Sequence, residues 1–249
     1  MMTMPKNGSK RPQREVLVRY ARTEAYENAV LGAQAVSVLG DEELRILARL
    51  RPPAARRDYL AAHALARTTL AEFAGCDPRR LRFHSWPFGR PEPVTQPGAR
   101  PLSFSISHTD GLALCAVSAG CPVGADVESR RNVETDPLGV ARRVCSEKER
   151  NALRALTASE RVDRLLYLWT FKEAVAKVRG LGFCLPLNYI SVDDACPWQV
   201  TSSRLTTDHV ASVAVLFPRE GRPVAIRFEE VHTCVSQPDP SESQALRAG

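Results

Sequence analysis

The stretch that decides the fold is residues 169–177, which read Trp-Thr-Phe-Lys-Glu-Ala-Val-Ala-Lys. Glu173 and Lys177 are four positions apart, so on a helix they lie on one face, with Trp169 one turn earlier. Apolar spacing predicts a long helix here, over residues 158–178. By itself a Glu–Lys pair at this spacing is a common surface feature that adds only about 0.2–0.5 kcal/mol.

A second stretch, upstream of this helix, carries two carboxylates. Residues 124–128 read Gly-Ala-Asp-Val-Glu, and on a strand Asp126 and Glu128 point to the same side because side chains alternate. Such a pair alone usually marks a solvated strand face. If the helix packs on this strand, however, Glu173 joins them. Three hard oxygen donors suit Mg²⁺, with Mn²⁺ as the alternative, and predict chemistry at a phosphate.

A histidine lies at the end of a predicted strand. Residues 102–106 alternate between apolar residues and serine, which predicts a strand that ends near Ser107 and His108. The Asp-Gly pair at 110–111 indicates a turn, and an apolar run over 112–117 forms the second strand of a hairpin. His108 is then either a structural residue or a donor to a ligand phosphate.

These motifs, in this order and at these separations, resemble those of the 4′-phosphopantetheinyl transferases. The resemblance is to the larger, surfactin-synthetase-activating type and covers residues 50 to 195. A further segment, Gly-Arg-Pro at 89–91, is similar to the family's Gly-Lys-Pro. Arg90 in place of lysine keeps the positive charge but offers a planar fork instead of a point charge.

The resemblance implies a specific reaction and specific residues. The enzyme would transfer the 4′-phosphopantetheine arm of coenzyme A (CoA) to a serine of apo acyl or peptidyl carrier proteins and release adenosine 3′,5′-bisphosphate. Such carriers serve fatty acid, polyketide and nonribosomal peptide synthesis. The implied metal ligands are Asp126, Glu128 and Glu173, and the implied catalytic residues are Glu173, Lys177 and Asp126. The implied CoA-binding residues are Arg57, Gly89, Arg90, Pro91, Ser107, His108 and Lys177.

The order of elements predicts an α+β fold built as a pseudo-dimer of two similar α+β halves. Each half has a long helix packed on a small antiparallel sheet, with the ligand cleft between the halves. The expected boundaries are a disordered N-terminus over 1–14, an N-terminal half over 15–120, a C-terminal half over 121–235 and a disordered tail over 236–249.

Individual elements follow from local signals. In the N-terminal half we expect a strand at 15–20, a polar connection, a helix at 41–50 and a long helix at 54–74 that ends at Gly75. In the C-terminal half we expect a strand at 123–128 and a helix at 146–156 that begins with a capping box, Ser146 with Glu149. The further strands expected there are at 189–193, 209–217 and 224–230.

Charge is unevenly distributed along the 249 residues, whose net charge is +6. Residues 1–100 hold 17 Lys and Arg against 10 Asp and Glu, whereas residues 101–249 hold 17 against 18. A polyanion such as CoA would bridge a basic part and a metal site. Nucleic acid is the competing partner for a basic patch, but no aromatic stacking run, zinc-finger spacing or helix-turn-helix accompanies it, so none is expected.

Cysteine usage and hydropathy favour a cytoplasmic protein. The seven cysteines are an odd number and none is in a Cys-X-X-Cys pair, which argues against disulfides or a zinc site. No apolar stretch approaches the length of a membrane span, and residues 1–14 lack the apolar core of a signal peptide. We therefore expect a monomeric pseudo-dimer in the cytoplasm.

Three other interpretations stay open on the sequence alone. A metal-dependent phosphohydrolase acting on CoA or a nucleotide could use the same three carboxylates, with water in place of a serine acceptor. A CoA- or nucleotide-binding protein without catalysis is the second alternative, although the intact carboxylates and Lys177 argue against it. A nucleic-acid-binding module is the third.

Overall fold

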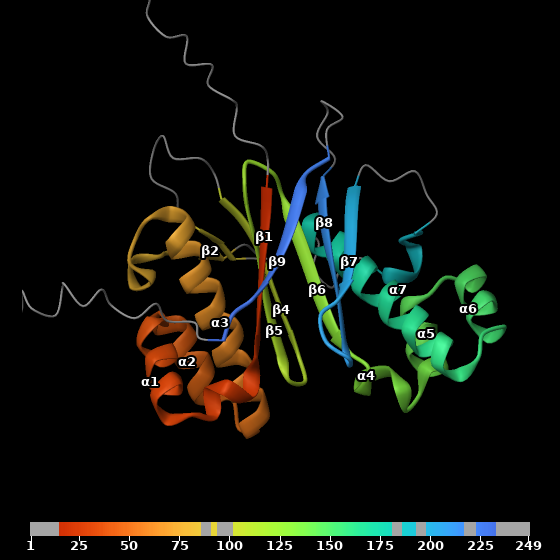
Figure 1. Ribbon diagram of the computed structural model, residues 1–249, viewed down its shortest axis with the longest axis horizontal. Helices are drawn as coiled ribbons and strands as arrows, with labels where there is room; N and C mark the ends of the chain where they lie inside the picture. The colour runs from red at the N-terminus through yellow and green to blue at the C-terminus, as the bar shows by residue number, and fades with distance from the viewer. Residues whose placement is uncertain are drawn as a thin grey trace, which may run out of the picture.

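The computed structural model of this chain describes residues 15–85, 91–93, 102–180, 186–192, 198–216 and 223–232. Two β-sheets lie next to each other at the centre, and helices cover the outer side of each (Figure 1). The α+β class expected from the sequence is confirmed. None of the helices within these ranges combines the length and apolarity that crossing a membrane requires.

The first sheet has the strand order β4-β5-β1-β9. Its antiparallel part consists of β4 (Leu102–Thr109), β5 (Leu112–Ala119) and β1 (Glu15–Arg22). The long helix α3 (Pro53–Ala74) packs on this part and ends, as predicted, at Gly75, whose φ of 61° requires a residue tolerant of the left-handed conformation. The other N-terminal elements are η1 (Thr23–Glu27), α1 (Ala29–Val38), α2 (Asp41–Arg49), η2 (Pro78–Arg80), β2 (Phe83–Ser85) and β3 (Pro91–Pro93).

The second sheet is antiparallel, with the order β6-β8-β7. Its strands are β6 (Val123–Ser129), β8 (His209–Leu216) and β7 (Trp198–Arg204). Helix α7 (Ala158–Val178) has the predicted bounds and packs on β6 and β8. The shorter elements beside it are α4 (Arg131–Glu134), α5 (Pro137–Val144), α6 (Glu147–Arg154) and η4 (Leu187–Tyr189).

Several expected elements need correction. The last strand, β9 (Ala225–Glu230), pairs in parallel with β1, so it extends the first sheet and does not complete the second half. The strand expected at 189–193 is wrong, because the chain there forms the 3₁₀ helix η4 and then irregular backbone up to residue 192. The connection before α2 contains the helix α1, capped by Asn28, whose side chain accepts from two backbone amides. The expectations for 1–14 and 236–249 lie outside the described residues.

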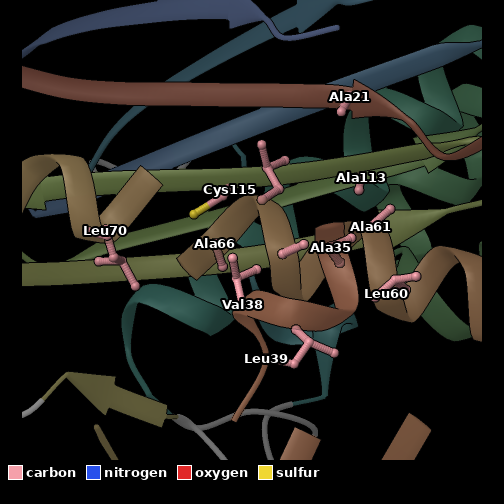
Figure 2. Close-up of a cluster of buried hydrophobic side chains, with 14 of the residues drawn as sticks. Ala21, Ala35, Val38, Leu39, Leu60, Ala61, Ala66, Leu70, Ala113 and Cys115 are labelled. Atoms are coloured by element: carbon pink, nitrogen blue, oxygen red, sulfur yellow. The ribbon is translucent and has the colours of Figure 1, made fainter. Parts of the chain in front are cut away.

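Alanine-rich packing brings α3 close to its sheet. Figure 2 shows side chains from α1, α3, β1 and β5 gathered in one buried cluster. Ala61 and Ala64 on the helix and Ala113 on the strand are fully buried. Small side chains let the helix axis approach the sheet, and Leu65 and Leu70 of the helix are almost completely buried beside them.

A row of hydroxyl groups joins the two sheets where β4 meets β6. The alternating Ser and Thr residues of β4 accept hydrogen bonds from backbone amides of β6, and the pairs are Ser103 with Val123 (3.1 Å), Ser105 with Ala125 (3.0 Å), Ser107 with Val127 (3.4 Å) and Thr109 with Ser129 (3.2 Å). These bonds fix the register of β6 against β4. The hydroxyl at the end of β4 therefore faces the carboxylates of β6.

Gly124 allows α7 to lie directly on β6. A Cβ atom at this position would overlap the carbonyl oxygen of Ala174 and the backbone nitrogen of Val178. The two backbones are thus in van der Waals contact, which places the last turn of α7 over the strand that carries Asp126.

Candidate functional site

Asp126 is the centre of the site. Its side chain is only 5% exposed, and its Oδ1 accepts hydrogen bonds from Lys177 Nζ at 2.7 Å and from Ser107 Oγ at 2.8 Å. One donor comes from α7 and the other from β4, so the site lies on the seam between the two sheets. Its Oδ2 is buried and, within the described residues, has no hydrogen-bond partner. A buried carboxylate oxygen without a partner is costly, which indicates a place for a cation.

Glu128 lies on the same face of β6, two residues further along. Its Oε2 accepts from Asn132 Nδ2 at 2.8 Å, and Thr109 Oγ1 lies 3.4 Å away. Burial raises the pKa of Glu128 to about 7, and the negative charge of Asp126 adds to this rise. The hydrogen bond from Asn132 and the charge of Lys177 act in the opposite direction.

Glu173 faces the same region from α7. Burial raises its pKa, and the nearby charge of Asp126 raises it further, whereas Lys177 lowers it. The helix therefore brings Glu173 and Lys177 to one face, as the four-residue spacing predicts. Within the described ranges, however, no group of three or more His, Cys, Asp or Glu side chains is arranged to hold a metal ion.

His108 is the next-to-last residue of β4, and it is exposed to solvent. The protein around it still lowers the pKa of the imidazole through desolvation, while the charge of Asp58 partly offsets this. A lowered pKa keeps the ring neutral at pH 7, and a neutral ring can still donate one hydrogen bond to a phosphate oxygen.

The remaining predicted CoA-binding residues either contact other parts of the protein or lie outside the described residues. Arg57 on α3 forms ion pairs with Glu27 at 2.8 Å and with Asp58 at 3.0 Å. Gly89 and Arg90 lie outside the described residues. Pro91 begins the short strand β3, where its backbone is paired with Ser85 of β2.

Lys172, beside Glu173 in sequence, points elsewhere. It is fully buried, and its Nζ donates to Glu149 Oε2 at 2.5 Å and to the carbonyl oxygen of Val144 at 3.0 Å. Glu149 also caps α6 through the amide of Ser146 at 2.8 Å, as the predicted capping box requires. Lys172 therefore anchors α7 to the α5–α6 segment, a role that the sequence left open.

Sequence reasoning did not identify two residues that contact Glu128. Thr109 continues the every-second-residue hydroxyl pattern of β4, which is a signal that could have identified it. Asn132 lies on the single-turn helix α4, and no sequence pattern indicates that its amide turns back to the strand.

Residues 122–235 match the model of the 4′-phosphopantetheinyl transferase superfamily. This segment contains the whole of β6, with Asp126 and Glu128, and the whole of α7, with Glu173 and Lys177. This chain is similar to the 4′-phosphopantetheinyl transferases. The resemblance predicted from the sequence motifs is confirmed.

Individual 4′-phosphopantetheinyl transferases are similar to this chain. A 4′-phosphopantetheinyl transferase of Bacillus subtilis is 32% identical over 133 residues, which cover 53% of this chain and 56% of that protein. HetI of Nostoc sp. (strain PCC 7120) is 28% identical over 72% of this chain and 79% of its own length. Sfp of Bacillus subtilis (strain 168) is 28% identical over 72% of this chain and 74% of its own length.

Proposed function

We propose that this protein transfers the 4′-phosphopantetheine arm of CoA to the side chain of a serine in an apo acyl or peptidyl carrier protein. The observation that carries the proposal is Asp126, a buried carboxylate held by Ser107 and Lys177 with one oxygen unpartnered. It lies within the segment that matches the transferase superfamily. The two sheets meet at this point, and the pyrophosphate of CoA would lie there, in a cleft between the two halves.

The donor set fits a divalent cation. A cation would satisfy the unpartnered Oδ2 of Asp126 and would favour the ionised form of Glu128, whose pKa is raised to about 7. Mg²⁺ usually takes only one or two protein carboxylates, with phosphate oxygens and water completing its coordination. This accounts for a site without three preassembled protein ligands. We therefore propose Asp126 and Glu128 as the primary ligands, with Glu173 as the third when CoA is bound.

Bound at this site, the metal would act as a Lewis acid toward the pyrophosphate. The serine oxygen of the carrier forms a bond to the phosphorus that bears the pantetheine arm. The bond from that phosphorus to the oxygen of adenosine 3′,5′-bisphosphate breaks, and the serine proton passes to a base. Glu173 is the proposed base, directly or through a water, because it is a carboxylate that faces the same region as Asp126 and Lys177 from α7.

Lys177 and the end of β4 would bind the phosphates. The ammonium group of Lys177 neutralises Asp126 and would also stabilise the negative charge that develops on the leaving group. His108 would donate one hydrogen bond to a CoA phosphate. Ser107 donates its hydrogen to Asp126, so a direct contact with a phosphate requires that this hydrogen be redirected.

The rest of CoA would be bound by the N-terminal half. We propose that Gly89, Arg90 and Pro91 line the adenine pocket, largely through their backbone. Arg57 would contact the 3′-phosphate in place of its present ion pair with Glu27 or Asp58. We place the reaction in the cytoplasm, where CoA and the carriers are found, and expect a monomer to carry it out.

Intact-protein mass spectrometry tests the proposal. An apo carrier incubated with this protein, CoA and Mg²⁺ should gain the mass of one phosphopantetheine arm, and EDTA should prevent the gain. Asp126→Ala should abolish transfer. CoA cleaved without any gain on acyl or peptidyl carriers would contradict the proposal and favour the phosphohydrolase interpretation.

A further inference from the structure

Asn132 makes a contact with Glu128 that the reaction above does not use. Its Nδ2 lies 2.8 Å from Glu128 Oε2 and 2.8 Å from Thr109 Oγ1. The side chain reaches back from α4, beyond the end of β6, to the carboxylate on that strand. The amide must present its NH₂ group here, because the reverse orientation would set its oxygen against a carboxylate.

The hydrogens of this group can be assigned one by one. Thr109 Oγ1 accepts from the backbone amide of Ser129 at 3.2 Å and from Asn132, which uses both of its acceptor positions. Its own hydrogen then points to Glu128 Oε2 at 3.4 Å. Asn132 uses one hydrogen on Thr109 and the other on Oε2. All of these side-chain hydrogen bonds to Glu128 end on the same oxygen.

Asp126 is held in the same one-sided manner. Ser107 and Lys177 both donate to Oδ1, whereas Oδ2 has no hydrogen-bond partner among the residues that the structure describes. On each carboxylate, therefore, the protein's donors occupy one oxygen. Asp126 and Glu128 are two residues apart on β6, so their side chains lie on the same face of the strand.

We propose that Asn132, together with Thr109, is a positioning residue of the cation site: it holds Glu128 through Oε2 and leaves Oε1 to bind the divalent cation. This inference rests on the proposed function, which supplies the metal. Groups that orient a metal ligand typically change metal affinity by about 10- to 100-fold when they are removed. Asn132 is exposed, so its replacement by alanine should leave the fold intact.

Direct binding of Mn²⁺, measured as free Mn²⁺ by electron paramagnetic resonance with and without CoA, tests the inference. Asn132→Ala should weaken Mn²⁺ binding about 10-fold. Asn132→Asp sets a second negative charge against Glu128. Because the new carboxylate could itself bind the cation, the Mn²⁺ affinity of this variant should differ from that of Asn132→Ala. Thr109→Val should weaken binding, whereas Thr109→Ser retains the hydroxyl and should restore it.

Two further measurements separate positioning from a general structural effect. Asn151→Ala, the same change on the exposed face of α6, is the matched control and should leave Mn²⁺ affinity unchanged. In the transfer assay Asn132→Ala should raise the Mg²⁺ concentration needed for half-maximal rate more than it lowers the rate at saturating Mg²⁺. Thermal unfolding without metal should match the wild-type protein.

Each outcome bears on the inference. Unchanged Mn²⁺ affinity in Asn132→Ala would overturn it, whatever the activity of the wild-type protein, and so would a wild-type protein that binds no Mn²⁺. A wild-type protein that binds Mn²⁺ but modifies no carrier would refute the proposed function alone. The Mn²⁺ affinities of the Asn132 variants would then still test the role of Asn132.

Discussion

Replacing Gly124 by alanine tests whether backbone contact between β6 and α7 builds the site. The new methyl group would overlap the carbonyl oxygen of Ala174 and the backbone nitrogen of Val178, and would lie 3.0 Å from the Cα of Val178. All three are main-chain atoms, so no side-chain rotation can relieve the overlap. The helix must shift away from the strand.

The change in the free energy of unfolding of Gly124→Ala follows from two opposing effects. Overpacking of this kind costs about 1–3 kcal/mol, whereas replacing a glycine stabilises a compatible backbone by only about 0.4–1 kcal/mol through the unfolded chain. We expect the free energy of unfolding to fall by about 1–2 kcal/mol, a net value set by these two ranges. The shift of α7 also separates Lys177 Nζ from Asp126 Oδ1, now 2.7 Å apart.

Two assays check this prediction together. Urea denaturation should show the loss of stability, and the transfer rate should fall because the ammonium group no longer lies on Asp126. Gly139→Ala is a useful control, because the three atoms nearest to its methyl would all belong to the side chain of Asp136, which caps α5. That variant should lose about 1 kcal/mol with the cap and keep its activity. Wild-type stability and activity in Gly124→Ala would refute the reasoning.

Three further predictions concern other parts of the site. Lys172→Met should destabilise the protein by about 3–5 kcal/mol in urea denaturation, because Glu149 is left without its buried partner; adding Glu149→Gln should recover part of the loss, and an unchanged midpoint would exclude an anchoring role. Glu128, with a pKa of about 7 against an ordinary 4.5, holds its proton more tightly in the folded protein, so metal-free stability should fall as pH rises from about 4.5 to 7. Over the pH range above 6, Mn²⁺ affinity should rise as this proton is lost, and thermal unfolding with and without metal would detect both effects. His108→Ala should raise the KM for CoA more than it lowers kcat in steady-state kinetics; an unchanged KM would contradict a phosphate contact.

Short-range signals determined many of the elements and most of the residues at the centre of the site. The bounds of α7, the end of α3 at Gly75 and the capping box that begins α6 follow from helical periodicity and from hydrogen bonds between residues a few positions apart. The same periods place Glu173 beside Lys177 and Asp126 beside Glu128. Local geometry is enough for these because each interaction is closed within one element.

Tertiary structure alone decided which elements meet. β9 was expected in the second half, but it pairs with β1, more than 200 residues earlier in the sequence, because strand pairing depends on which sheet edge is open and not on local pattern. Lys172 finds Glu149 only when α6 is packed against α7. The hydrogen bond from Asn132 to Glu128 likewise depends on the path of the chain after β6. No periodic signal in the sequence marks the contacts of Lys172 and Asn132, so their partners are set by packing.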